Sequence, residues 1–221
     1  MSSNPNTISQ IYAIIKKDLI LEFRRGYEYL SSLAFVMAAS LVVSQIITKL
    51  FREDLFIPSI WIIIVFLGIF TTSNSFIREV DKKTIYGVRL LPISASIIFL
   101  SKTIYTYILV LSQSILYLLF QTLFTMLTPK VTPDLIITLL IFTFNISVIA
   151  SFTSALVMYS EGRSFLIPML IFIFSLPVIP LATVLSDPAL PTGPFDLPLL
   201  AIETLTVFFT FTFLTEYLLE V

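Results

Sequence analysis

The segment that decides the fold is residues 135–160, LIITLLIFTFNISVIASFTSALVMYS, which contains no Asp, Glu, Lys or Arg. A helix needs about 20 apolar residues to cross a hydrocarbon core of roughly 30 Å, so this segment is long enough to span a bilayer. Four other uncharged segments have similar lengths, and residues 197–219 are interrupted only by Glu203 and Glu216. The sequence therefore predicts an all-α integral membrane protein with six transmembrane helices. The predicted spans are about 29–49, 56–77, 93–127, 135–158, 164–186 and 198–219, within a single transmembrane domain of residues 1–221.

The composition supports a membrane protein and excludes several kinds of chemistry. Of the 221 residues 57% are hydrophobic and only 12% are charged, whereas soluble domains carry about 25% charge. The chain has no Cys and no His. Disulfides, cysteine nucleophiles and histidine bases or metal ligands are therefore excluded.

The basic residues indicate how the chain is oriented, because cytoplasmic loops of membrane proteins are enriched in Lys and Arg. If the N-terminus is inside, ten basic residues fall on the cytoplasmic side and three on the other. The three outer residues are Lys49, Arg52 and Lys130. We therefore expect a multi-pass protein of the cell membrane with both termini in the cytoplasm.

The segment before the first span, residues 7–28, has the pattern of an amphipathic interfacial helix. Its apolar residues recur at steps of three and four, and its basic residues lie on other faces. Two interpretations stay open. The helix either only anchors the chain at the headgroup boundary, or it is an elbow that also contacts a cytoplasmic partner.

The loop between the second and third predicted spans carries a dense cluster of charges, from Arg78 to Arg89. We expect a short helix on the cytoplasmic face there, which either docks a partner or only fixes the orientation of the chain. Lys102 lies about two turns into the third span, and we expect its long side chain to reach the cytoplasmic interface.

Polar residues inside the spans have two interpretations. Gln113, Tyr117 and Gln121 share one face of the third span, and Asn145 lies in the fourth. Hydrogen bonding between helices is the simpler role, and the lining of a substrate cavity is the alternative. Glu203 lies near the outer edge of the last span, where we expect it to face water. The Pro-rich stretch 187–198 cannot be a regular helix and is expected to cap a cavity or half-enter the membrane.

The chain lacks the motifs of an enzyme. It has only five Gly, and no G-x-x-x-x-G-K-[ST] phosphate loop can be written. No catalytic or metal-binding constellation is present, and Glu203 is the one candidate for an ion-coupling acid in the membrane. If the protein performs transport work, the energy is expected to come from another subunit.

Residues 17–25, KDLILEFRR, resemble the N-terminal signature of the haem exporter protein B (CcmB) family. Trp61, Phe76 with the acidic cluster after it, Asp81-Lys-Lys-Thr84, Leu91-Pro92 and the ten-residue step to Lys102 are similar to the same family. The resemblance covers roughly the first half of the chain. The sequence departs from the family at Lys83, where Gly is usual, and at Tyr86, where Glu often stands.

The resemblance implies an ABC-2 type permease of the cytochrome c maturation system. It implies a homodimer bound to a cytoplasmic ABC ATPase subunit, next to a haem-handling membrane protein, with no role for nucleic acid. The chain itself would bind no cofactor; ATP would act through the partner, and haem would be the pathway substrate. A general ABC-2 exporter of lipid, drug or polysaccharide and a non-transporting scaffold remain alternatives. The residues expected to couple to the ATPase subunit are Lys17, Asp18, Arg24, Arg25, Arg78, Glu79, Asp81, Lys82 and Arg89.

Overall fold

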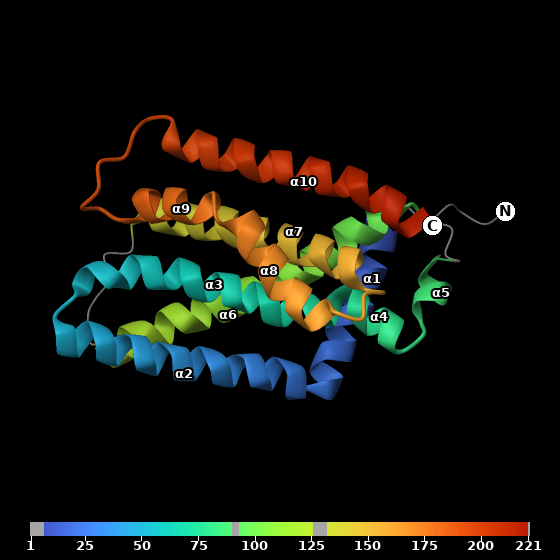
Figure 1. The fold of residues 1–221 in the computed structure, drawn as a ribbon, viewed down its shortest axis with the longest axis horizontal. Coiled ribbons are helices and arrows are strands. Elements are labelled where there is room, and N and C mark those ends of the chain that lie inside the picture. The colour runs from blue at the N-terminus through green and yellow to red at the C-terminus, as the bar shows by residue number, and fades with distance from the viewer. Residues whose placement is uncertain (1–6, 90–92, 126–131, 221) are drawn as a thin grey trace.

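The computed structural model describes residues 7–89, 93–125 and 132–220, so the Leu91-Pro92 pair lies outside the described residues. The described residues form helices and no strand (Figure 1). The helices are α1 (Thr7–Arg25), α2 (Tyr27–Leu50), α3 (Phe56–Thr72), α4 (Arg78–Asp81), α5 (Ile85–Arg89), α6 (Ala95–Thr125), α7 (Pro133–Val157), α8 (Arg163–Ser175), α9 (Val178–Ser186) and α10 (Asp196–Glu220).

Five helical segments of the described chain are long and apolar enough to cross a membrane, and the bent pair α8–α9 makes a sixth if it counts as one span. The five are Tyr29–Leu50, Glu53–Asp81, Ala95–Thr125, Pro133–Val157 and Asp196–Leu218. The long helices lie roughly along the same axis (Figure 1). The predicted all-α membrane fold is therefore confirmed.

Helix α7, the segment that decided the fold, lies at the centre of the bundle. It packs against α3, α6, α8, α9 and α10. Gly68 of α3 allows the closest approach, since a Cβ added there would lie 2.5 Å from Cγ2 of Ile146. Nearby, the ring of Trp61 is fully buried and lies 4.9 Å from the ring of Phe142. The uncharged segment is thus the core of the protein and not a helix surrounded by lipid.

The predicted span 164–186 corresponds to two helices, α8 and α9, which are bent by 54° relative to each other. The break falls at Leu176 and Pro177. Proline has no N–H to donate and clashes with the preceding turn, so the helix ends before Pro177 and a new one begins after it.

The Pro-rich loop is shorter than the predicted 187–198, because α10 begins at Asp196. Pro198 lies in the first turn of α10, where a missing N–H costs nothing. The carboxylate of Asp196 accepts a hydrogen bond from the backbone N–H of Gly193 at 2.6 Å. Residues 188–195 are exposed, which does not fit the expectation that this loop caps a cavity.

The backbone also departs from a regular helix between α3 and α4, at Ser75, whose φ and ψ are −90° and −117°. The N–H groups of Phe76 and Ile77 both donate to Oγ of Ser154 on α7, at 2.9 and 3.2 Å. The break therefore has its own hydrogen-bond acceptor, and it sets the direction in which α4 leaves the span.

The turn from α1 to α2 depends on Gly26, which has a φ of 56°. Such a positive φ is unfavourable for residues that carry a Cβ. The turn lets α1 pack against α6 while α2 continues along the bundle. α1 and the C-terminal end of α10 lie at the same end of the bundle (Figure 1).

Candidate functional site

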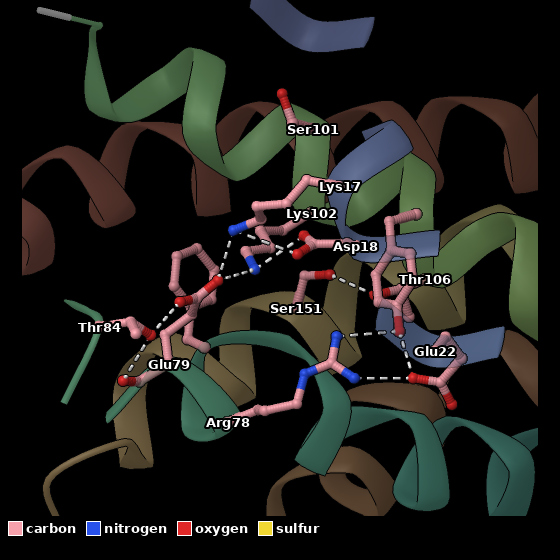
Figure 2. A network of polar contacts seen from close by, with 12 residues as sticks. Lys17, Asp18, Glu22, Arg78, Glu79, Thr84, Ser101, Lys102, Thr106 and Ser151 are labelled. Atoms are coloured by element: carbon pink, nitrogen blue, oxygen red, sulfur yellow. Dashed lines mark hydrogen bonds and ion pairs between the residues drawn. The ribbon is translucent and has the colours of Figure 1, made fainter. Parts of the chain in front are cut away.

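The candidate site is a cluster of charged side chains where α1, α4 and α6 meet (Figure 2). We call it the charge cluster, and its members are Lys17, Asp18, Glu22, Arg78, Glu79, Lys102 and Tyr105. Three of these side chains carry a positive charge and three a negative charge, so the cluster is neutral overall. Segments far apart in the sequence meet here through ion pairs.

Lys102 of α6 is the centre of one half of the cluster. Its Nζ lies 2.8 Å from a carboxylate oxygen of Asp18 and 3.0 Å from one of Glu79. Lys102 is only 1% exposed and Asp18 is 0% exposed. Charges removed from water in this way are tolerated only when they are paired, so each of the three groups requires the others.

Arg78 of α4 is the centre of the other half. Its Nη1 donates to Oε2 of Glu22 at 2.8 Å, and its Nη2 lies 3.4 Å from the hydroxyl of Tyr105. The Tyr105 hydroxyl in turn donates to the same carboxylate oxygen of Glu22 at 2.8 Å. Arg78, Glu22 and Tyr105 are all buried. α1 is therefore held to both α4 and α6 a second time.

Lys17 closes the cluster on its outer side, where its side chain is 43% exposed. Its Nζ donates to Glu79 at 2.8 Å and lies 3.3 Å from Asp18. Burial alone lowers the pKa of Lys17, but the charge of Asp18 and the hydrogen bond to Glu79 outweigh it and raise the pKa above its usual value. Lys17 is therefore fully charged at neutral pH.

The charge cluster connects helices through buried ion pairs. Replacing a buried ion network by apolar groups is often neutral for stability, but removing one partner is costly because it leaves a charge unpaired. No group of three or more His, Cys, Asp or Glu able to hold a metal occurs in the part of the chain that the structure describes. The ion pairs join α1 to α4 and α6, so a shift of α1 would move these helices or break ion pairs.

The structure shows where the residues expected to couple to the ATPase subunit lie. The role of Asp18, Arg78 and Glu79 in coupling to the ATPase subunit stays a prediction, but their side chains are buried inside the chain. The reason is that they neutralise one another and Lys102. Lys102 is buried inside the bundle. The prediction that its side chain reaches the cytoplasmic interface is therefore wrong.

The remaining predicted docking residues divide into two groups. Arg24, Asp81 and Lys82 are exposed, and Asp81 forms an ion pair with Arg163 at 2.8 Å. The side chains of Arg25 and Arg89 lie outside the described residues. Arg24, Asp81 and Lys82 are thus the predicted residues that the described structure places at the surface.

The polar residues predicted inside the spans mostly join helices. Gln113 donates to Ser32 at 2.6 Å and Gln121 to Ser59 at 2.8 Å, both between α6 and a neighbouring helix. Asn145 donates to Thr204 of α10 at 3.3 Å. Tyr117 is fully buried, and Glu203 is half-buried on α10. These contacts match the packing interpretation and do not gather the residues around one cavity.

The inward face of α1 was not predicted from the sequence. Asp18 and Glu22 face the bundle together with Ile14, whereas Ile8, Tyr12 and Phe23 are exposed. The signal was present, because Asp18 and Glu22 are four residues apart and therefore share a face. A lysine inside an apolar span also requires an acidic partner.

The resemblance seen in the first half of the sequence extends over almost the whole chain when the chain is compared with known protein families. Residues 9–215 match the family described as CcmB protein. No match to an individual curated protein was found.

Proposed function

The chain belongs to the CcmB family, and from this membership we propose that it is the permease subunit that a separate cytoplasmic ATPase drives through the charge cluster. The family is that of the permease component of a haem-exporting ABC transporter in cytochrome c biogenesis, and it is not itself catalytic. The chain is a multi-pass membrane protein. The proposal concerns how ATP hydrolysis in the partner would reach the spans.

The observation that carries the proposal is the way the charge cluster ties α1 to two spans. Asp18 and Glu22 of α1 bind Lys102 of α6 and Arg78 of α4. α4 continues from the span that contains α3. A partner that pushes α1 sideways would therefore move the ends of two membrane helices at once.

The surface proposed for the ATPase surrounds the charge cluster. Arg24 of α1 and the turn with Asp81, Lys82 and Lys83 are exposed close to the charge cluster. Charged rims of this kind orient a partner and affect its association rate more than its final affinity. We place the ATPase subunit here, on the cytoplasmic side, with both termini of the chain on that side.

The remaining parts of the assembly follow from the family. Two copies of the chain would bind two ATPase subunits next to a haem-handling membrane protein, and haem would be the substrate of the pathway. ATP would bind only to the partner, because no phosphate loop can be written in this sequence. The chain itself would hold no cofactor.

The proposal is tested by separating binding from coupling in the reconstituted permease–ATPase complex. In the double variant Asp18→Asn/Lys102→Met, one positive and one negative charge are lost, so the cluster stays neutral. We expect the ATPase subunit to co-purify as before, with loss of the ATPase stimulation that the permease provides and of cytochrome c maturation in cells. Lys16→Met is the matched control, since Lys16 is exposed on the same helix.

Unchanged ATPase stimulation and unchanged cytochrome c maturation in the double variant would refute a coupling role for the cluster. The docking surface has a separate test. Lys82→Glu together with Arg24→Glu should weaken co-purification of the ATPase subunit, and full retention would remove this surface from the proposal.

A further inference from the structure

A cavity of about 650 Å³ opens next to the charge cluster, between α2, the end of α3, α4 and the start of α8. The ion pairs of the charge cluster do not fill it. Cavities of this size accommodate a small organic molecule. One part of its wall is formed by charged side chains and another part by apolar side chains.

The charged part of the wall is mainly basic. Among the described side chains, the basic residues of the wall are Arg78, Lys82 and Arg163, and Asp81 is the acidic one. Arg78 is also paired with Glu22 and Arg163 with Asp81, so the described groups and these partners leave one positive charge in excess. The first turn of α8 adds to this, because Ser164 lines the cavity and the residue before the helix, Gly162, has no side chain that could cap the N–H groups there. Both features favour an anion at this part of the cavity.

The apolar part of the wall is formed by Ile69, Phe70, Ile167 and Pro168. Phe70 is 42% exposed, so the apolar wall continues onto the outer surface of the bundle. A soluble anion such as inorganic phosphate would leave this part unfilled. The occupant that fits both parts is an anion with a hydrocarbon chain.

Gln113 of α6 closes the inner side of the same cavity. It lines the cavity and is only 1% exposed, its Nε2 donates to Ser32 at 2.6 Å, and its Oε1 has no hydrogen-bond partner among the described residues. A buried acceptor without a donor is costly. This Oε1 atom is itself buried beneath the wall, so it is not counted as a contact for an occupant of the cavity.

We propose that this cavity binds the phosphate headgroup of an anionic phospholipid, with an acyl chain lying along Ile69, Phe70 and Ile167. Basic pockets between membrane helices on the cytoplasmic side bind such headgroups. Haem is also an amphipathic anion, but the described lining contains no His, Cys or Met, and among these described residues Tyr27 alone has a side chain of a type that ligates haem iron. The site does not depend on which species the transporter moves.

The test is lipid binding to the detergent-purified full chain, measured by native mass spectrometry with dioleoyl-phosphatidylglycerol and dioleoyl-phosphatidylcholine as probes. Lys82→Gln/Arg163→Gln should raise the Kd for phosphatidylglycerol about tenfold or more, because each basic residue near a lipid surface contributes to binding. Binding of phosphatidylcholine should change little.

The chain offers a closely matched control at the opposite end of α2. Arg52 forms an exposed ion pair with Asp54 at 2.8 Å, as Arg163 does with Asp81, and Lys49 lies nearby on the surface. Lys49→Gln/Arg52→Gln removes the same charge and should leave phosphatidylglycerol binding within twofold of the unmodified chain. An equal loss in both variants would show that general surface charge attracts the lipid, and would overturn the proposal.

Two further outcomes would also overturn it. Displacement of phosphatidylglycerol by inorganic phosphate would identify a site for soluble anions, and displacement by haem would identify a different amphiphile. If the double variant loses its helical circular dichroism, Ser31→Trp replaces it, because Ser31 lines the cavity and the larger ring would fill it with all charges in place. Normal phosphatidylglycerol binding by a folded Ser31→Trp variant would refute the site.

Discussion

Replacing Lys102 by Met should strongly destabilise the protein, because Lys102 is the shared cation of two buried carboxylates. Removing one partner of a buried ion pair costs about 3–5 kcal/mol. Glu79 would keep Lys17 at 2.8 Å, whereas Asp18 would keep only a longer contact with Lys17 at 3.3 Å. Most of the loss therefore arises at Asp18, and we expect a decrease in the free energy of unfolding of about 3 kcal/mol, at the lower end of this range.

The same reasoning predicts that Asp18→Asn rescues part of this loss. With the carboxylate neutral, the double variant Asp18→Asn/Lys102→Met no longer buries an unpaired charge at this position. The two substitutions should therefore be non-additive, with a coupling energy of about 2 kcal/mol, within the range for residues of one ion-pair network. Lys16→Met serves as the control and should change stability by less than about 0.5 kcal/mol.

Unfolding can be followed through Trp61, which is the chain's one Trp and is fully buried against Phe142. Its fluorescence should shift as sodium dodecyl sulfate is titrated into mixed micelles, and the four proteins of the double-mutant cycle give the coupling energy. Additive effects of the two substitutions would refute the interpretation that Lys102 and Asp18 depend on each other. So would a loss below about 1 kcal/mol for Lys102→Met, because that is the range of exposed ion pairs.

Three further substitutions test how the spans pack and how burial affects the contribution of an ion pair to stability. Gly68→Ala should lower the free energy of unfolding by about 1–3 kcal/mol, because the added methyl group overpacks against Ile146. In thermal unfolding, the double variant Gly68→Ala/Ile146→Ala should lose less stability than the sum of the losses in the two single variants. Ser154→Ala should cost about 1–3 kcal/mol, because two buried backbone N–H groups lose their acceptor, and hydrogen exchange at those two amides should accelerate. Arg163→Gln should cost less than about 1 kcal/mol in the same unfolding assay, because its pair with Asp81 is exposed; a loss as large as that of Lys102→Met would contradict the contrast between buried and exposed pairs.

The spans could be predicted from the sequence because they depend on length and hydropathy alone. An uncharged run such as 135–160 has few alternatives to a membrane helix, and the structure confirms it as α7. The break before Pro177 also had a local signal, since proline interrupts the helical hydrogen bonds. The non-helical turn at Ser75 had none, because its acceptor, Ser154, is 78 residues away in the sequence from Phe76, which donates to it.

The charge cluster could be predicted only in part, because the sequence shows that charges exist but not which of them meet. Asp18, Glu79 and Lys102 were each assigned to a water-facing or partner-facing position on their own segments. Their burial depends on how α1 folds back onto α6, which Gly26 permits through its positive φ. The spacing of Asp18 and Glu22 indicates that they share a face of α1, but which helices that face meets is tertiary information.

The order of the charges along the chain has a consequence for biosynthesis. A lysine within an apolar helix costs about 2.5–3.5 kcal/mol on insertion scales when it enters the membrane unpaired. Glu79 is made 23 residues before Lys102, and Asp18 is made earlier still. Both acids therefore leave the ribosome before α6 does, so Lys102 is inserted after the two carboxylates that neutralise it. A circular permutant in which α6 is synthesised first would lose that advantage while keeping every contact of the finished protein.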